Sequence, residues 1–345
     1  MKAILYDAPR SFAYRDVPDP TPEPDEVVLR IHACGVCGTD LHIHEGEFAP
    51  RFPLIPGHEF AGAIAAIGSQ VASQAGHWAL GDRVVANCNR ACGRCFHCRR
   101  GQALYCRTLV AYGIQMDGGF APLMRIKASE LYPLKTLSWR EAIMVEPTAC
   151  AVHGMDVLSV RPGADVLMFG AGPTGQVLAQ LLKRNGAASL TVAAPPGPKL
   201  ALAERLSADR VVAIDRTDPE LHRRALRDIS RNGFDYVVEA TGAPSMCAEA
   251  LRQVRRGGTV LIYGVYPDTE TFPVSPFDLF RDEITLKGSF AQIHDFDRSL
   301  AYLESGQVKV ADIVTDEFEL KDWARALDHA WKRQGIKSVM LPPGS

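Results

Sequence analysis

The sequence GAGPTG at residues 170–175 follows a short apolar run, Asp165 to Phe169, and leads into an amphipathic segment, Gln176 to Lys183. Strand, glycine-rich turn and helix in this order are the context in which the G-x-G-x-x-G pattern binds a dinucleotide. The first glycine permits a tight turn, the second lets the backbone approach a pyrophosphate, and the third allows the helix to pack closely on the strand. The helix N-terminus is then suited to hold the phosphates. The stretch predicts a nucleotide-binding α/β domain rather than an α/β domain without a nucleotide.

Short apolar runs and helical spacers alternate on the C-terminal side of this turn. The apolar runs have the length and composition of buried strands. They lie at Ser189–Ala194, Val211–Ile214, Phe234–Val238 and Thr259–Tyr263. The helical spacers lie at Lys199–Leu206, Glu220–Ser230 and Pro244–Val254. This alternation is typical of a doubly wound parallel sheet with α/β architecture.

The residues that end the second strand favour NADP as the cofactor. About 20 residues beyond the glycines, NAD-binding proteins carry an acidic residue that hydrogen-bonds the ribose 2′-hydroxyl. This chain has Ala193-Ala194-Pro195-Pro196 there, with Lys199 and Arg205 further along. No carboxylate would repel a 2′-phosphate, so we expect NADP to be accepted and preferred, with NAD binding through its other contacts as the alternative. The expected cofactor contacts are Gly170, Gly172, Pro173, Thr174, Gly175, Ala194, Lys199 and Thr241.

The N-terminal part of the chain is predicted to form an irregular β-rich domain. Its strand-like segments are Ala3–Tyr6, Glu26–His32, Phe60–Ile67 and Arg83–Ala86. Strands and helices no longer alternate after Lys287. We therefore expect the C-terminal segment, from Phe290–His294 onward, to return to this first domain. The prediction is one domain at residues 1–150 and 290–345 and a dinucleotide-binding domain at residues 151–289, with zinc and cofactor in the cleft between them.

A thiolate, an imidazole and a carboxylate fall within 22 positions of one another in the β-rich domain, at Cys37, His58 and Glu59. Aromatic and proline residues between them can fold them back on one another. These are ligand types that zinc prefers, and a catalytic zinc needs three protein ligands and one position left open for substrate. For the trio alone, the alternative is a buried cysteine and a hydrogen-bonded core histidine.

Four cysteines follow with the spacing C-x2-C-x2-C-x7-C, at Cys92, Cys95, Cys98 and Cys106. Four thiolates at such intervals can close a tetrahedral shell, which marks a structural zinc site with no place for substrate. A chance cluster of reduced thiols is the weaker alternative, because exposed thiols at this density would be prone to oxidation. Cys88 lies four residues before Cys92 and could replace one of the four ligands.

Glu146 offers a further carboxylate, in the apolar run from Met144 to Cys150. Pro147 directly after it suits the first turn of a helix that Ala149 to Leu158 could continue. From this segment alone, a partly buried glutamate with ordinary partners is the alternative to a metal ligand.

The composition of the 345 residues is that of an ordinary globular protein, with 47% hydrophobic and 23% charged residues. The length exceeds one typical core and favours two domains.

The formal charge of −2 and the dispersed basic residues argue against a nucleic-acid partner or an anionic membrane surface. No apolar run approaches the roughly 20 residues of a membrane helix, and Asp7 and Pro9 come too early for a signal peptide. Nine cysteines without a secretion signal indicate metal ligands rather than disulfides, and a cytoplasmic protein.

Together these motifs resemble those of the zinc-dependent medium-chain dehydrogenases/reductases, the alcohol dehydrogenase superfamily. The resemblance covers nearly the whole chain. It rests on CGVCGTDLH (34–42), GHEFAG (57–62), GDRV (81–84), the four cysteines, VEP (145–147) and GAGPTG, in that order. It implies a GroES-like catalytic domain and a Rossmann domain, with one catalytic and one structural zinc per chain. It also implies a dimer or tetramer that assembles through the edge of the nucleotide-domain sheet, near Thr259–Tyr263 or Ile284–Phe290.

The family pattern gives roles to single residues of this chain. Cys37 and His58 become ligands of the catalytic zinc. The carboxylates of Glu59 and Glu146 become further ligands or lie next to the ligands. The four clustered cysteines become the structural site. Thr39 matches the hydroxyl that contacts the reacting alcohol in the family pattern. His42 matches the histidine at the end of a proton relay. The catalytic residues are then Cys37, Thr39, His42, His58, Glu59 and Glu146.

The pair Glu146-Pro147 indicates the subgroup, because it is similar to sorbitol, xylitol and arabinitol dehydrogenases. Many simple alcohol dehydrogenases instead have a cysteine as third protein ligand. We therefore expect oxidation of a polyol to a ketose, with L-threonine or a simple alcohol as alternative substrates, since threonine dehydrogenases share the CGTD stretch. The missing acidic residue at Ala194 departs from the NAD-linked sorbitol enzymes. Candidate pocket residues are Phe48, Phe52 and Phe290, each with a core role as the alternative.

The reaction implied by the resemblance is hydride transfer. Zinc acts as a Lewis acid on the substrate hydroxyl, hydride passes to the nicotinamide, and the proton leaves through Thr39 and the cofactor ribose toward His42. A noncatalytic nucleotide sensor is a rival from another class, but it would not need a complete proton path. A cysteine lobe that binds nucleic acid is a third interpretation, against which the near-neutral charge argues.

Overall fold

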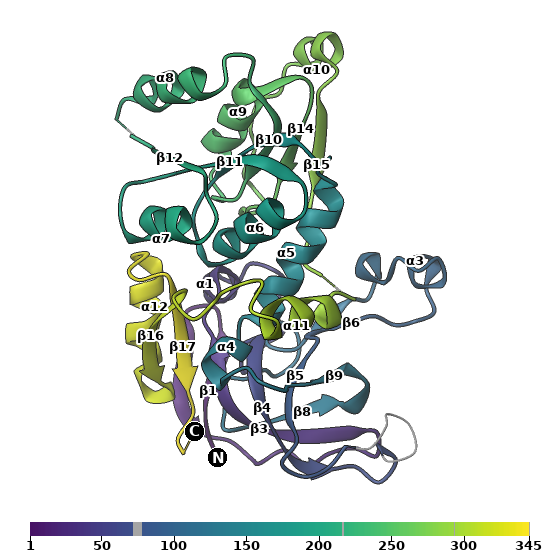
Figure 1. Cartoon of the computed structure of the whole chain (residues 1–345). Helices are drawn as coiled ribbons and strands as arrows, with labels where there is room; N and C mark the ends of the chain where they lie inside the picture. Colours follow the sequence, from purple (N-terminus) through teal and green to yellow (C-terminus); the bar gives the residue numbers. More distant parts are fainter. Residues whose placement is uncertain (72–77, 216, 293, 345) are drawn as a thin grey trace. The chain divides into compact units, whose positions relative to one another are not determined.

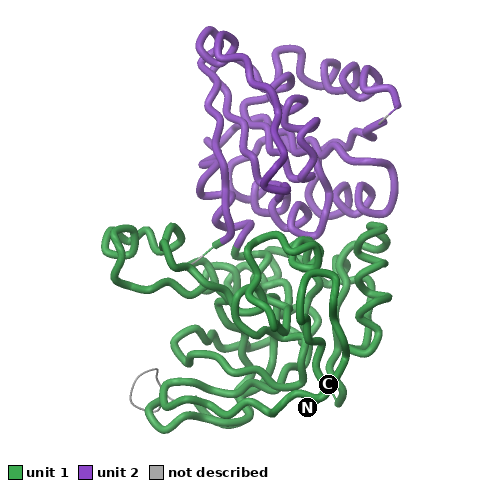
Figure 2. Tube along the Cα trace, turned by 180° about the vertical axis from the view of Figure 1, so that it is seen from behind, with its two compact units in different colours: residues 1–149, 292–345 green, residues 150–291 purple. Residues whose placement is uncertain are grey.

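The structure is a computed structural model that describes residues 1–71, 78–215, 217–292 and 294–344. The chain divides into two compact units, residues 1–149 with 292–345 and residues 150–291 (Figures 1 and 2). Ile293, in the segment Phe290–His294 that was expected to return to the first domain, lies outside the described residues. Within the described ranges, no helix has the length and apolar character required to cross a membrane.

The second unit contains a six-stranded parallel sheet with the order β12-β11-β10-β13-β14-β15. Numbered along the chain, this is the order 3-2-1-4-5-6 of two βαβαβ halves, in which ligands bind at the carboxyl ends of the two central strands. These central strands are β10 and β13. The predicted doubly wound parallel sheet is confirmed. The strands are β10 Ala164–Phe169, β11 Ala187–Ala194, β12 Arg210–Ala213, β13 Phe234–Glu239, β14 Val254–Ile262 and β15 Thr285–Gly288.

Five helices of this unit begin with the same signal, a proline in the first turn. Proline suits this position because its fixed φ is helical and its missing N–H would have no partner within the helix. The helices are α6 Pro173–Arg184, α7 Pro198–Leu206, α8 Pro219–Ile229, α9 Pro244–Gln253 and α10 Pro276–Asp282. Pro147 also lies in the first turn of its helix, α5 Val145–Leu158, as the sequence indicated.

The first unit is rich in β-structure, as expected. Seven strands form one sheet with the order β16-β17-β3-β4-β5-β9, and β8 pairs with β3. They are β3 Glu26–Gly35, β4 Glu59–Ile67, β5 Arg83–Ala86, β8 Leu123–Lys127, β9 Leu131–Pro133, β16 Val314–Glu319 and β17 Lys337–Leu341. Two further strand pairs are β1 Lys2–Ala8 with β2 Ser11–Asp16, and β6 Asn89–Arg90 with β7 Val110–Ala111. The helices are α1 Gly38–Glu45, α3 Phe96–Arg99, α4 Trp139–Ala142, α11 Phe296–Glu304 and α12 Trp323–Trp331.

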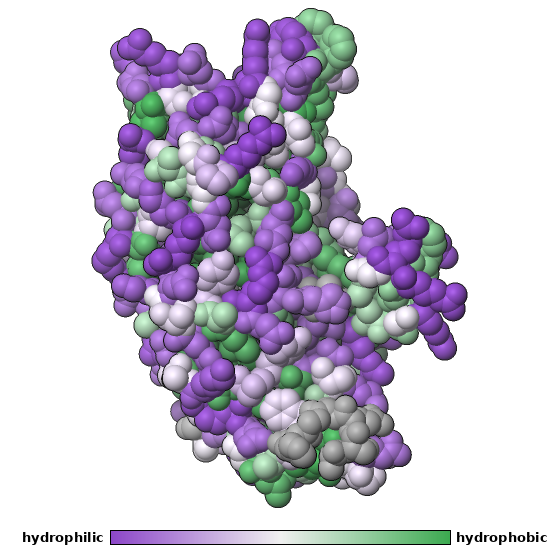
Figure 3. Space-filling model, turned by 45° about the vertical axis from the view of Figure 1, so that its right-hand side comes forward, coloured by the Kyte–Doolittle hydropathy of each residue, from purple (hydrophilic) through white to green (hydrophobic). Residues whose placement is uncertain are grey.

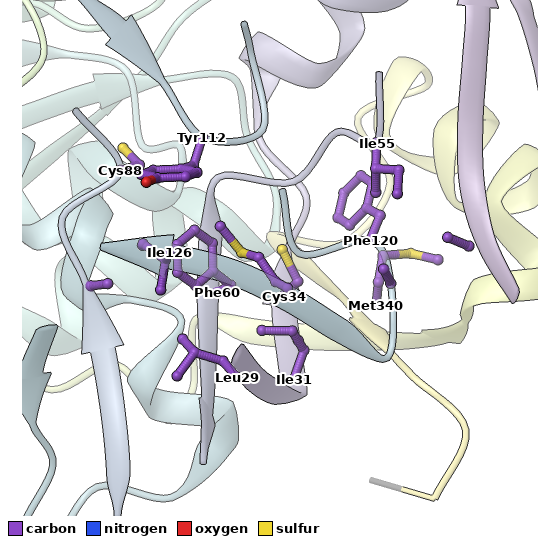
Figure 4. Packing of buried hydrophobic residues seen from close by; sticks show 14 of the residues in the cluster. Leu29, Ile31, Cys34, Ile55, Phe60, Cys88, Tyr112, Phe120, Ile126 and Met340 are labelled. Atoms are coloured by element: carbon purple, nitrogen blue, oxygen red, sulfur yellow. The ribbon is translucent and has the colours of Figure 1, made fainter. Parts of the chain in front are cut away.

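The core of the first unit lies against the central strands of its sheet. Ile31, Phe60 and Ile126, from three paired strands, are almost fully buried in one cluster, and Figure 4 shows them in this packing. The C-terminal segment contributes to the same cluster, because Trp323 is buried in it and its indole N–H donates to Tyr6 Oη at 2.9 Å. The two ends of the chain therefore build one core.

Candidate active site

The register of two neighbouring strands brings a cysteine, a histidine and a glutamate together. β3 and β4 are antiparallel, with Gly35 opposite Glu59. Cys37 lies two residues beyond the end of β3, and His58 directly precedes β4. One ligand atom from each of Cys37, His58 and Glu59 lies within 4.8 Å of the others. Gly35 leaves the necessary room, because a Cβ there would come within 2.1 Å of Glu59 Oε2.

The carboxylate of Asp40 connects this cluster to helix α1. Asp40 is buried, and its Oδ2 accepts a hydrogen bond from the backbone N–H of Cys37 at 2.8 Å, which caps the helix. Its Oδ1 lies 3.7 Å from His58 Nδ1. Asp40 thus accepts a hydrogen bond from one member of the cluster and places a negative charge beside another. The sequence placed Asp40 within a motif but gave it no role.

Lys337 also reaches the cluster, from the other end of the chain. β17 pairs with β3 so that Val339 lies opposite Gly35, which puts Lys337 beside the start of α1. Its Nζ forms an ion pair with Glu59 Oε2, and both side chains are buried. Burial lowers the pKa of Lys337, but the charges of Glu59 and Cys37 outweigh burial and raise that pKa. Sequence reasoning missed this residue.

The cluster has the donors and the electrostatic surroundings that a zinc ion requires. Thiolate, imidazole and carboxylate are all zinc ligands. Among the described residues, His58 Nδ1 is buried without a hydrogen-bond partner, although buried polar atoms are normally satisfied. Glu59 Oε2 is already ion-paired with Lys337. Burial lowers the pKa of His58, yet Asp40 and Cys37 raise it well above its usual value, which shows that the surroundings are negative. The residues therefore fit a bound cation.

Glu146 lies near this cluster but outside it. Among the described residues, the set of ligand atoms within 4.8 Å of one another includes Glu59 and not Glu146. The thiol of Cys88 donates to Glu146 Oε1 at 3.8 Å. Burial raises the pKa of Cys88 well above its usual value, and Glu146 and Glu59 add to the effect. Cys88 is therefore a buried neighbour of both carboxylates.

The four cysteines of the C-x2-C-x2-C-x7-C motif form a second cluster. One ligand atom from each lies within 4.8 Å of the others, and Cys88 does not belong to this set. The turn points its backbone N–H groups at the sulfur atoms, and those of Cys98 and Arg107 lower the pKa of Cys95 to about 6. Thiolates are the form that binds metal. The members of the cluster are Cys92, Cys95, Cys98 and Cys106.

Thr39 and His42 both lie on α1, one turn apart, and therefore on one face of the helix. Thr39 Oγ1 is 3.7 Å from Cys37 Sγ, which places the hydroxyl next to the three-residue cluster. His42 lies in the last turn and contacts Glu47 and Phe48. Of the candidate pocket residues, Phe48 and Phe290 are exposed, whereas Phe52 packs against the hydrophobic core.

The glycine turn lies at the centre of the parallel sheet in the second unit. Gly170 follows β10 with φ +108°, and a Cβ there would meet the Ala240 carbonyl oxygen at 2.7 Å. Gly172 is the N-cap of α6, and nothing lies within 4 Å of the position its Cβ would take. The space in front of the helix N-terminus is open, as a pyrophosphate requires. Pro173, Thr174 and Gly175 form the first turn of α6.

The other expected cofactor residues lie at the carboxyl ends of the neighbouring strands. Ala194 is the last residue of β11, and Lys199 lies in the first turn of α7. Thr241 follows β13, and its backbone N–H donates to Glu239 Oε1 at 2.7 Å. The buried Glu239 also accepts from Tyr266 Oη. Sequence reasoning missed Glu239, although a carboxylate that ends a buried apolar strand is a detectable signal.

Comparisons with known proteins identify the family of the chain. The chain matches the family described as "Alcohol dehydrogenase GroES-like domain" over residues 23–136 and "Zinc-binding dehydrogenase" over residues 173–305. It is 44% identical to D-arabinitol dehydrogenase 1 of Uromyces fabae over 99% of this chain and 97% of that protein. It is 35% identical to D-altritol 5-dehydrogenase of Agrobacterium fabrum over 87% of each. A Sinorhizobium meliloti structure described as a zinc-binding dehydrogenase bound to NADP superposes with a TM-score of 0.92, at 29% identity over 99% of both chains.

Proposed function

The chain belongs to the zinc-binding alcohol dehydrogenases, and we propose that it oxidises a secondary hydroxyl of a polyol to a ketone, giving a ketose, with NADP or NAD as hydride acceptor. The observation that carries this proposal is the cluster of half-buried Cys37 with buried His58 and Glu59, whose ligand atoms lie within 4.8 Å of one another. The polyol class is supported by the 44% identity to a D-arabinitol dehydrogenase along nearly the full length of both chains.

The three clustered residues would hold a catalytic zinc, and Glu146 is a second glutamate near them. A zinc ion there supplies a Lewis acid toward the substrate hydroxyl, and a nicotinamide cofactor at the glycine turn supplies the hydride acceptor. Thr39 Oγ1 hydrogen-bonds the reacting hydroxyl, and His42 takes up a proton at its imidazole. Asp40 orients His58 and the start of α1. The four-cysteine cluster would hold a second, structural zinc, giving two zinc ions per chain.

The substrate is tested by initial rates against pentitols, hexitols, simple alcohols and L-threonine, each with NAD and with NADP, before and after a zinc chelator. We expect chelator-sensitive oxidation of a polyol, because the cluster offers three ligands and leaves one zinc position for a hydroxyl. Oxidation of L-threonine or of a simple alcohol alone would contradict the polyol assignment. If no substrate reacts while NADP still binds, the chain is better explained as a noncatalytic nucleotide sensor than as an enzyme.

The cofactor preference for NADP is tested by Ala194→Asp. A carboxylate at the end of β11 would accept a hydrogen bond from the ribose 2′-hydroxyl of NAD and repel the 2′-phosphate of NADP. Because placing like charges together costs several kcal/mol, we expect the ratio of kcat/KM for NADP to that for NAD to fall by about tenfold or more. Ala194→Asn is the control, since it has the same size and no charge. If the ratio of kcat/KM for NADP to that for NAD is equal in wild type and in Ala194→Asp, the proposed link between Ala194 and NADP preference is wrong.

We also propose that the chain forms a homo-oligomer through the edge of its nucleotide-binding sheet. β15 is the last strand of that sheet, and α10 beside it exposes Phe277 by 63% and Phe280 by 81%. Figure 3 shows hydrophobic side chains over α10, at the top of the view. An unpaired strand edge beside exposed aromatic side chains favours association with another copy. A monomer mass by light scattering would contradict this proposal.

We also propose a cytoplasmic location, which is supported by the nine cysteines, since none of them forms a disulfide in the structure.

A further inference from the structure

The segment that follows α1 folds back on His42 through its backbone. Gly46 ends the helix with φ +89°, a left-handed conformation that glycine adopts readily. The next N–H, that of Glu47, donates to the carbonyl oxygen of His42 at 2.9 Å. This is the bond pattern of a helix C-cap in which the chain reverses over the last turn. The backbone hydrogen bond alone therefore places Glu47 next to His42.

The side chains of Glu47 and Phe48 then enclose the imidazole. Glu47 Oε2 lies 2.5 Å from His42 Nδ1. The ring of Phe48 packs edge-on against the imidazole, with 5.2 Å between ring centroids. Phe48 and Ala49 have φ of +64° and +47°, values that are unfavourable for residues other than glycine. The Gln115 side chain donates to the Phe48 carbonyl oxygen at 3.0 Å and helps to hold this unusual loop. Such strained backbone is often found at functional sites.

We infer that Glu47 is a positioning residue for catalysis, which fixes the tautomer of His42 so that Nε2 is the atom that accepts the proton. The inference rests on the proposed function, in which His42 takes up a proton. An ionised carboxylate only accepts hydrogen bonds, so His42 Nδ1 must carry the hydrogen that Glu47 binds. In the neutral imidazole, Nε2 is then free of hydrogen and is the basic atom.

The carboxylate has a second effect once the proton has arrived. Protonation of Nε2 makes an imidazolium whose charge lies directly against Glu47, which stabilises it. The side chains of His42 and Glu47 are 20% and 34% exposed, so the proton can pass from the ring to water. The neighbouring ionisable groups have other partners, because Glu45 pairs with Arg10 and His44 Nδ1 lies 3.0 Å from Tyr6 Oη.

Kinetics of four single variants and one double variant test the catalytic part of the inference. We expect Glu47→Ala to lower kcat/KM by about tenfold, a part of the 10²- to 10⁴-fold that a positioned proton acceptor contributes. Glu47→Gln keeps an acceptor for Nδ1–H without the charge, and we expect it to recover part of the loss. Glu45→Ala removes a charge two residues away that pairs with Arg10, and should leave kcat/KM unchanged. In a His42→Gln background, Glu47→Ala should cause no further loss, because Glu47 acts through His42. An equal loss in that background would overturn the inference.

Nitrogen-15 NMR of the histidine side chains tests the tautomer independently of turnover. The His42 signals are identified by their disappearance in His42→Gln. We expect a hydrogen on Nδ1 in the wild type, and a shift toward the Nε2–H tautomer in Glu47→Ala. A wild-type His42 that carries its hydrogen on Nε2 would overturn the inference. If the wild type oxidises no substrate of the panel, the proposed function fails, and the nitrogen signals still decide whether Glu47 sets the tautomer.

Discussion

Cys37→Ser is expected to lower kcat/KM for polyol oxidation by about 10³-fold or more, because a Lewis-acidic zinc stabilises the transition state by several kcal/mol. Zinc binds a thiolate, whereas a serine hydroxyl stays protonated near neutral pH and is a poor ligand. The fold should persist. Cys37 is the N-cap of α1, and serine is among the residues preferred at that position. The measurement is kcat/KM together with metal content, which we expect to fall from about two zinc ions per chain to about one.

Cys95→Ser is the matched comparison, because it makes the same exchange in the four-cysteine cluster. A structural zinc contributes to folding and not to substrate binding. We therefore expect a larger fall in Tm from Cys95→Ser than from Cys37→Ser, which loses only the stabilisation by metal bound to the folded state. Wild-type turnover by Cys37→Ser would show that Cys37 is not a ligand of a catalytic zinc. An unchanged Tm in Cys95→Ser would count against a structural zinc.

The central strands of the nucleotide-binding unit could be predicted in detail because they are buried on both faces. Such strands are continuous apolar runs with a clear beginning and end, and β13 begins at Phe234 as expected. β14 is the exception, since it begins at Val254, five residues before the predicted start at Thr259. Val254 pairs with Phe234, and the register then shifts before Thr259 pairs with Tyr236. The intervening polar and glycine residues conceal this irregular start in the sequence.

The candidate active site was only partly predictable, because ligand types are visible in a sequence and strand pairing is not. Cys37, His58 and Glu59 could be proposed together since they belong to adjacent motifs, and the structure brings them together. Lys337 joins them through the pairing of β17 with β3, between opposite ends of the chain, and no local pattern marks it. Glu47 is an intermediate case. Gly46 is a helix-ending signal that implies a chain reversal toward His42, but the hydrogen bond between Glu47 and His42 itself depends on side-chain conformation.

The buried ion pair of Lys337 and Glu59 gives the largest expected effect on stability. Lys337→Met keeps most of the side-chain volume but leaves the Glu59 carboxylate buried without its partner. Breaking a buried pair in this way typically costs about 3–5 kcal/mol. For a unit of this size we expect Tm to fall by about 6 °C or more. The measurement is thermal unfolding of the zinc-stripped protein, in which no metal can compensate for the charge of Glu59.

Two further variants distinguish a charge effect from a general effect of replacing lysine. Lys332 pairs with Asp328 on the surface, with both side chains 58% exposed, so Lys332→Met should cost less than about 1 kcal/mol. Adding Glu59→Gln to Lys337→Met removes both buried charges, and we expect this double variant to regain most of the lost Tm in the zinc-stripped state. If Lys337→Met instead melts like Lys332→Met, the pair does not stabilise the fold. If the double variant melts lower still, packing by Lys337, rather than its charge, supports the cluster.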